Sequence, residues 1–332
     1  MKNEKLLNNF NFHGEVIDVV SDVADRFRKL SYSKIEASLP ATTKFSYQDD
    51  RLPISVLDII PKNDFEDVLV YHLPMGNDIN SNMKFLIATI REALPNKRII
   101  VTGNTAEPGQ NSAKLAYSDI WEIHLGNVKS LIKPVVRYLA NQAINETIQV
   151  GYSYGAEKTA MFSSLGHFYN QKITKSIILE PVAIKKRKFI DLAYNFLRSG
   201  LLMEDYVKET NCLAYEEARN LATIEGRGTL GYLVGLGRLG NLAISAELAK
   251  NNFFNRISTA LIHQPQMKSV LGWGKNSELA SNHNMLELVT LLKDSFGPRI
   301  NDLSLDDQTH AMGDNIFLQL ALILQSFKIL ED

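Results

Sequence analysis

Gly151-Tyr152-Ser153-Tyr154-Gly155 is the stretch of sequence around which the rest of this chain is arranged. An apolar run at 146–150 predicts a short buried strand before it, and residues 156–165 predict a helix after it. A G-x-S-x-G pentapeptide between a strand and a helix is typical of a nucleophile elbow, a turn so sharp that glycine is needed on both sides of the serine. We therefore expect Ser153 to adopt a strained conformation beside a helix N-terminus that favours negative charge.

Strand and helix patterns alternate through the first half of the chain. Buried strands are predicted at 54–60, 68–72, 98–102 and 175–179, and helices at 82–94 and 120–143. Pro134 is expected to kink or divide the second of these helices. Such alternation predicts an α/β fold with right-handed crossovers and a mostly parallel sheet.

Two segments depart from this alternation. Residues 1–50 form a predicted N-terminal extension, with a helix within 1–30 and a hairpin-like stretch at 44–52. Residues 182–255 carry helical patterns at 189–202 and 215–224 and a glycine-rich stretch at 226–240. We interpret 182–255 as a helical cap inserted into a core made of residues 1–181 and 256–332. A nucleotide site built on the glycines of 226–240 is the weaker interpretation, because no strand clearly precedes them in a βαβ unit.

The pattern of the core resumes after this segment. A strand is predicted at 267–271, a helix at 285–296, a last strand at 299–305 and a closing amphipathic helix at 316–330. A polar loop at 306–314 separates the last strand from the closing helix.

Composition excludes several classes of protein. The 332 residues are 45% hydrophobic and 22% charged, as in ordinary globular proteins. A formal net charge of -1 provides no electrostatic basis for binding nucleic acid or an anionic membrane. The single cysteine, Cys212, excludes an intrachain disulfide and a CxxC zinc site and fits a reducing compartment. Residues 1–9 show no apolar run of a secretory signal, and 316–327 is too short to span a membrane, so we expect a cytoplasmic protein.

The order of these features resembles the α/β-hydrolase superfamily over roughly residues 50–181 and 255–330. The strand ending in His72 lies where members carry a His-Gly loop that forms half of the oxyanion hole. The loop at 108–112, Pro-Gly-Gln-Asn-Ser, looks like the turn after the next strand, and the elbow follows at the expected distance. His310 follows the last predicted strand, where the family places its base. The resemblance implies an α/β-hydrolase fold with helices on both faces of a mostly parallel sheet and a helical cap.

The resemblance also implies a nucleophile and a base. A serine hydroxyl is a poor nucleophile at neutral pH and needs a base beside it. Family order is serine, acid, histidine, and this order assigns Ser153 as nucleophile and His310 as base. No two histidines of the chain have a metal-binding spacing such as H-E-x-x-H, so neither a metal nor another cofactor is predicted.

The acid that should orient the base has several candidates. In the family it commonly follows the strand that is predicted here at 267–271, and the local spacing puts Ser277 where an aspartate is usual. Glu278, one residue further on, is the favoured candidate. Glu180, directly after the preceding core strand, occupies the other acid position known in the superfamily. Asp306, Asp307 and the absence of any acid stay open as alternatives.

The predicted oxyanion hole departs from the family pattern on one side. The backbone N–H of Tyr154, the residue after the nucleophile, is the first expected donor. On the loop after His72, Leu73 replaces the usual glycine and Pro74, which has no N–H, occupies the usual donor position. A re-registered loop, with Met75 or Leu73 as donor, is one interpretation, and an incomplete hole is the other.

Two functions follow from these assignments. The first is a serine hydrolase that cleaves an ester, thioester or amide of a small or acyl substrate through an acyl-enzyme on Ser153. The second is a non-catalytic α/β-hydrolase-like protein used for binding or structure, which the missing aspartate and Pro74 favour.

Overall fold

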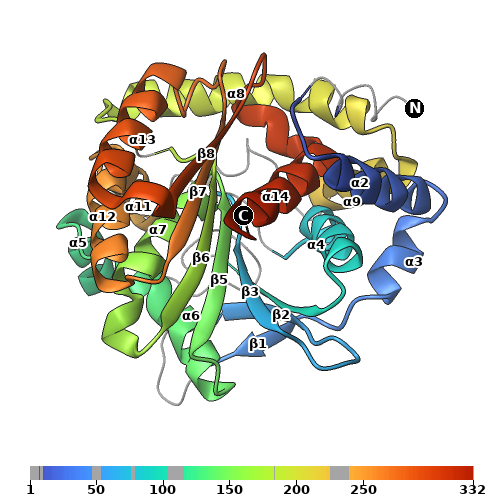
Figure 1. Ribbon diagram of the computed structural model, residues 1–332, viewed down its shortest axis with the longest axis horizontal. Helices are drawn as coiled ribbons and strands as arrows, with labels where there is room; N and C mark the ends of the chain where they lie inside the picture. Colours follow the sequence, from blue (N-terminus) through green and yellow to red (C-terminus); the bar gives the residue numbers. More distant parts are fainter. Residues whose placement is uncertain are drawn as a thin grey trace.

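The computed structural model describes Leu7 and residues 10–46, 54–75, 79–103, 116–182, 184–224 and 239–331. Within these residues eight strands form one sheet, in the order β1-β2-β4-β3-β5-β6-β7-β8 (Figure 1). The strands are β1 (Thr43–Phe45), β2 (Ile54–Ile59), β3 (Asp67–His72), β4 (Lys97–Thr102), β5 (Glu146–Tyr152), β6 (Lys172–Leu179), β7 (Lys268–Gly274) and β8 (Ile300–Leu305).

The sheet is parallel from β4 through β8, and only its first edge is antiparallel. β1 pairs antiparallel with β2, and β2 pairs antiparallel with β4. The remaining neighbours, from β4–β3 to β7–β8, run parallel. The central strands are apolar runs buried on both faces, as expected where helices cover a parallel sheet on both sides. The carboxyl ends of β3, β5, β6, β7 and β8 consequently lie along one edge, and this edge carries the candidate site.

Helices surround the sheet. Those of the core are α2 (Gly14–Phe27), α3 (Tyr32–Ala37), α4 (Ser81–Ala93), α5 (Tyr117–His124), α6 (Lys129–Asn141), α7 (Tyr154–Leu165), α12 (Phe253–His263), α13 (Asn282–Phe296) and α14 (Ile316–Glu331). Between β6 and α12 lie α8 (Phe189–Thr210), α9 (Leu213–Ile224) and α11 (Leu239–Leu248). Short 3₁₀ turns are η1 (Gly166–Tyr169), η3 (Gly297–Arg299) and η4 (His310–Asp314).

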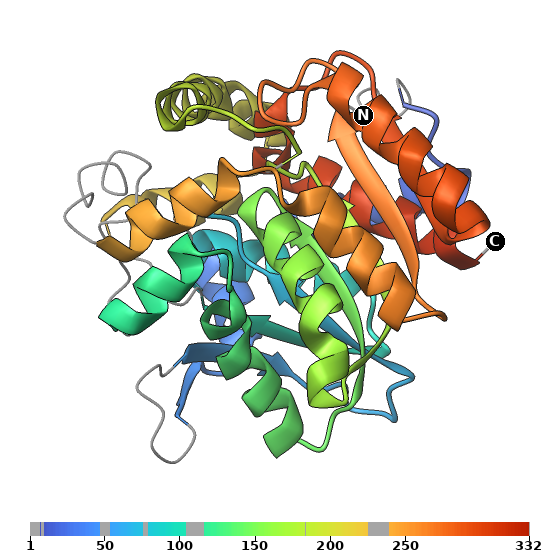
Figure 2. The ribbon, with the colours of Figure 1, turned by 90° about the vertical axis from the view of Figure 1, so that its left-hand side faces the viewer.

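Two hydrophobic cores lie on opposite faces of the sheet. One joins the buried sides of α2, α4 and α14 to one face of the strands. The other joins α6, α7, α12 and α13 to the opposite face, and these four helices lie in front of the sheet in Figure 2. Almost every side chain of α7 is buried, because this helix packs between the sheet and its neighbours α6 and α12. The elbow at its N-terminus is therefore set on a rigid support.

The described elements confirm the α/β-hydrolase fold class expected from the sequence and correct it in two places. Pro134 lies inside α6, and the division of the predicted 120–143 helix falls before it, where Gly126 has a φ of 92°. A left-handed residue ends a helix readily when it is glycine, so the break needs no proline. The short helix α3 was not expected, because within the first 60 residues the sequence predicted a helix only within 1–30 and strand-like stretches from 44 onward. The predicted loop at 108–112 and most of the 226–240 stretch lie outside the described residues.

Among the helices that the structure describes, none is both long and apolar enough to cross a membrane. Over the same residues, no group of three or more His, Cys, Asp or Glu side chains is arranged to hold a metal ion.

Candidate active site

The elbow has the geometry that its glycines predict. Ser153 follows β5 directly and has φ 57° and ψ -122°, a strained conformation for a residue with a side chain. A Cβ on Gly151 would lie well under 3.0 Å from the backbone of Gly155, and a Cβ on Gly155 would lie well under 3.0 Å from the carbonyl of His72. Both positions therefore admit only glycine, since backbone atoms cannot move aside as a flexible side chain can.

The candidate base lies against the serine. His310 is the first residue of η4, which follows β8, and its side chain is buried. Its Nε2 atom is 2.9 Å from Ser153 Oγ. This is hydrogen-bond distance, so the imidazole is placed to accept the proton of the serine hydroxyl.

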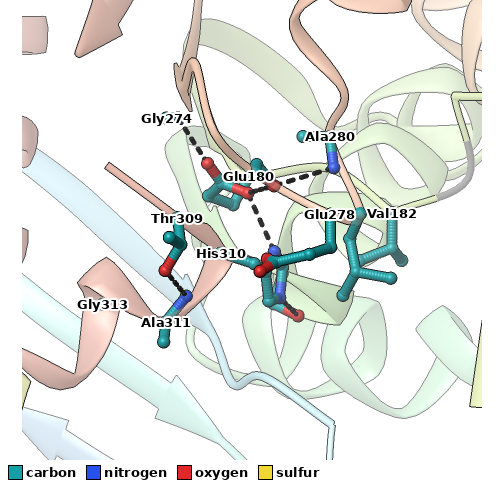
Figure 3. Close-up of polar contacts among 12 residues, drawn as sticks. Glu180, Val182, Gly274, Glu278, Ala280, Thr309, His310, Ala311 and Gly313 are labelled. Carbon is teal, nitrogen blue, oxygen red and sulfur yellow. Dashed lines mark hydrogen bonds and ion pairs between the residues drawn. The ribbon is translucent and has the colours of Figure 1, made fainter. Parts of the chain in front are cut away.

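A carboxylate completes the line of contacts on the far side of the imidazole (Figure 3). Glu180 follows β6 with φ 54°, and its side chain is fully buried. Its Oε2 atom is 2.8 Å from His310 Nδ1 and accepts a hydrogen bond from Ser277 Oγ at 2.6 Å. Its Oε1 atom accepts from the backbone N–H of Gly274 at 2.5 Å. Because a carboxylate oxygen accepts hydrogen bonds, His310 Nδ1 donates to Glu180, and in the neutral ring Nε2 then carries no proton and faces Ser153.

The favoured acid candidate, Glu278, does not contact the imidazole: Glu180, the second candidate, accepts the hydrogen bond from His310. The side chain of Glu278 is also buried, but its carboxylate lies 3.8 Å from Arg198 Nε of α8. Its backbone carbonyl accepts a hydrogen bond from Arg187. The physical reason is the order of the strands. Glu180 directly follows β6, which pairs with β5, the strand that directly precedes Ser153, whereas the loop after β7 contacts the Glu180 carboxylate through Ser277 and not through Glu278.

Ser277 and Tyr152 have roles that sequence reasoning missed. Ser277 fills the usual acid position and donates its hydroxyl hydrogen to Glu180, so it orients the acid from the neighbouring loop. The hydroxyl of Tyr152 donates to the backbone carbonyl of His310 and accepts from the N–H of Gly313 at 3.0 Å. A Cβ on Gly313 would collide with the ring of Tyr152. No sequence motif marks these contacts, which join residues more than 90 positions apart.

One expected oxyanion donor, Tyr154, begins the elbow helix, and the loop that carries the other starts beside it. Tyr154 is the first residue of α7, where the partial positive charge of the helix N-terminus favours a developing negative charge. The carbonyls of His72 and Leu73 approach Gly155 so closely that a Cβ there would meet both, which places the loop after β3 beside the first turn of α7. Met75 lies on this loop and is half-buried. That the backbone N–H groups of Tyr154 and Met75 donate to an oxyanion remains a prediction.

His72 is a buried neutral side chain at the end of β3. Its Nε2 atom is 2.7 Å from Gln149 Oε1 of β5. Burial, and next the charge of Lys158, lower the pKa of His72 to about 3. The neutral ring donates to Gln149 and joins the two strands that carry the oxyanion loop and the nucleophile.

His72 is expected to make the protein less stable as the pH falls. Below its ordinary pKa of 6.5, His72 binds a proton in the unfolded chain, whereas in the folded chain it stays neutral down to about pH 3. The contribution of neutral His72 to the free energy of unfolding is therefore fully present above pH 6.5 and is lost as the pH falls toward 3. The slope is about 1.4 kcal/mol per pH unit between roughly pH 6 and 4. Asp314 acts in the opposite direction over the same range, because burial raises its pKa to about 6.

The measurement is therefore a comparison of two proteins. The free energy of unfolding of the wild-type chain and of His72→Gln is determined by urea denaturation at several pH values, and their difference cancels the contribution of Asp314. We expect the difference to shrink as the pH falls. A difference that does not depend on pH would contradict the buried neutral state of His72.

Comparisons with known sequences do not assign the chain to a family. No family model matches the chain. A curated relative, the UDP-N-acetylmuramoyl-tripeptide–D-alanyl-D-alanine ligase of Buchnera aphidicola subsp. Acyrthosiphon pisum, is 30% identical over 135 residues, 40% of this chain and 26% of that ligase. The chain thus matches about a quarter of the ligase, and a match over so small a share of both proteins shows no common family.

Solved structures match nearly the whole chain. A carboxylesterase of the thaumarchaeon Nitrososphaera gargenis has a TM-score of 0.57 at 13% identity, over 86% of this chain and 97% of that one. An α/β-hydrolase enzyme from a Medee basin deep-sea metagenome library has 0.54 at 16%, over 86% and 97%. A thioesterase domain from the curacin biosynthetic pathway has 0.52 at 14%, over 87% and 99%. At these identities the likeness concerns architecture, and by its strand order, its elbow and these neighbours the chain has the α/β-hydrolase fold.

Proposed function

We propose that the chain is a serine hydrolase that cleaves an ester, thioester or amide through an acyl-enzyme on Ser153. The observation that carries the proposal is the unbroken line of contacts from Ser153 to His310 to Glu180, with distances of 2.9 and 2.8 Å. Three side chains from three different strand ends meet in the order nucleophile, base, acid, as acyl transfer requires. The similar architectures of a carboxylesterase and a thioesterase domain support the same class of reaction.

The proposed reaction has two halves. Ser153 Oγ attacks the acyl carbon while His310 Nε2 takes the hydroxyl proton, and the charged imidazole is stabilised by Glu180. The N–H of Tyr154 and a donor on the loop after His72, in our proposal Met75, hold the tetrahedral oxyanion. His310 then gives its proton to the departing alcohol, thiol or amine. In the second half water attacks the acyl carbon while His310 takes a proton from it, and His310 returns this proton to Ser153 Oγ as the acid product leaves.

Residues 182–255 are proposed to cap this site. The helix α8 runs across the ends of β7 and β8 (Figure 1). It packs against η4, the turn that begins with His310. The ring of Phe196, on α8, is 6.5 Å from the imidazole of His310 and meets it edge-on. Apolar groups in this position suit a small acyl substrate.

The non-catalytic alternative rested on two departures in the sequence. Glu180 offers an acid where the usual aspartate is missing, which favours the enzyme. Pro74 has no N–H to donate to an oxyanion, and this departure still favours the non-catalytic alternative. The following experiment distinguishes the two functions.

We expect a fluorophosphonate probe to label the protein on Ser153 and p-nitrophenyl esters of some chain length to be hydrolysed. Ser153→Ala should abolish both the labelling, read by mass spectrometry of the modified peptide, and the hydrolysis. Ser118→Ala, which alters an exposed serine of α5, is the matched control and should behave as wild type. Absence of labelling in the folded wild-type protein, or hydrolysis that survives in Ser153→Ala, would refute the proposed function and favour a binding role.

A further inference from the structure

The backbone of the turn that carries His310 is held by phenol groups from other parts of the chain. Tyr152, at the end of β5, contacts the backbone of His310 and Gly313 through its hydroxyl. Two further phenols come from the segment between β6 and β7, Tyr206 of α8 and Tyr215 of α9. Tyr215 donates its hydroxyl hydrogen to the backbone carbonyl of Asp314 at 3.1 Å.

Tyr206 contacts the residue next to the candidate base. Its hydroxyl oxygen accepts a hydrogen bond from the backbone N–H of Thr309 at 3.1 Å and another from Thr309 Oγ at 3.3 Å. Thr309 Oγ in turn accepts from the N–H of Ala311 at 3.3 Å and caps η4. A single phenol on α8 therefore holds the main chain and the side chain of the residue that precedes His310.

Tyr206 is suited to this position because it stays neutral. Burial is the main cause that raises the pKa of Tyr206 above its ordinary value, and the charges of Glu209 and Glu180 act in the same direction. A neutral phenol can accept from Thr309 without placing a second negative charge beside Glu180.

We propose that Tyr206 is a positioning residue for His310, so that α8 must stay docked on η4 for catalysis. The inference rests on the serine-hydrolase function proposed above. Its physical basis is the narrow tolerance of the imidazole, which has to keep Nε2 at 2.9 Å from Ser153 and Nδ1 at 2.8 Å from Glu180 at the same time. A displacement of about 1 Å in such an arrangement can cost roughly 10²-fold in rate.

The first test is Tyr206→Phe, which removes the acceptor and keeps the ring. With a p-nitrophenyl ester we expect kcat to fall by roughly 10- to 100-fold while KM changes by less than about two-fold, because the base and not the substrate is displaced. Tyr194→Phe is the matched control: it removes a phenol oxygen from the same helix, where the side chain is 64% exposed. Thr309→Val, which removes one of the two donors, is expected to lower kcat in the same direction and serves if Tyr206→Phe does not fold.

The second test separates positioning from a general loss of structure. In a His310→Ala background the residual hydrolysis should be the same with and without Tyr206→Phe, because Tyr206 acts through His310. An equal fold-loss in both backgrounds would overturn the proposal, and so would a wild-type kcat in Tyr206→Phe.

The two proposals fail in different ways. If fluorophosphonate does not label the folded wild-type protein, the hydrolase function is refuted, and the inference about Tyr206 is refuted with it. If the wild-type protein is labelled on Ser153 and Tyr206→Phe is labelled at the same rate, only the positioning role of Tyr206 is refuted.

Discussion

Glu180→Gln is expected to lower kcat by about 10⁴-fold, whereas Glu278→Gln should leave it within a few-fold of wild type. Three donors converge on the Glu180 carboxylate: Gly274 N–H on Oε1, and Ser277 O–H and His310 Nδ1 on Oε2. Glutamine offers one oxygen and one NH₂, so at least one of these donors then faces another donor. If the NH₂ faces His310, the ring is driven to the tautomer with its proton on Nε2, which cannot take the proton of Ser153.

The comparison of the two glutamates is internally controlled. Both side chains are buried, both belong to loops at the same edge of the sheet, and both substitutions keep the size of the residue. The measurement is kcat with a p-nitrophenyl ester, together with the thermal unfolding midpoint of each variant, since burying an altered group also costs stability. A loss of activity in Glu278→Gln as large as in Glu180→Gln would contradict the proposed order of Ser153, His310 and Glu180.

Gly155→Ala is expected to destabilise the fold by about 3 kcal/mol and to abolish hydrolysis in the fraction that folds. The new Cβ would overlap the carbonyl of His72 and lie 3.1 Å from the carbonyl of Leu73. Relief requires α7 and the end of β3 to move apart. Because these two segments carry the proposed oxyanion donors, the movement that accommodates the methyl group also separates Tyr154 from the loop after His72.

Gly14→Ala is the matched control for this prediction. A Cβ at Gly14, the first residue of α2, meets nothing within 4 Å. We expect it to leave stability unchanged or to raise it by up to about 1 kcal/mol, because alanine restricts the unfolded chain. Both variants are compared with wild type by chemical denaturation. A Gly155→Ala protein as stable and as active as Gly14→Ala would show that β3 and α7 are not in close contact at the elbow.

The distance between residues in the sequence explains which predictions succeeded. The elbow was predictable because each of its requirements is local: an apolar strand, two glycines without room for a Cβ, and a helix that begins at the next residue. The mostly parallel sheet followed from the alternation of elements, and the antiparallel pairing of β1 with β2 follows from the short connection between these two strands.

The acid of the site shows where such reasoning ends. Glu180 and Glu278 both follow buried strands, so the local sequence around each was compatible with a carboxylate near the imidazole, and the resemblance to the family favoured Glu278. Their separation depends on the order of strands across the sheet and on the 2.6 Å contact that makes Ser277 a partner of Glu180. Neither is visible in a one-dimensional pattern.

The sequence by itself determined most of the elements, the class of fold and the strained serine, because these depend on periodicity and on backbone sterics over a few residues. The tertiary structure alone decided which carboxylate meets His310 and that phenols of Tyr152 and Tyr206 hold the turn beneath it. The physical reason is that a hydrogen bond needs its two atoms about 3 Å apart in space. For these residues only the folding of the sheet brings together groups that lie 100 or more positions apart in the chain.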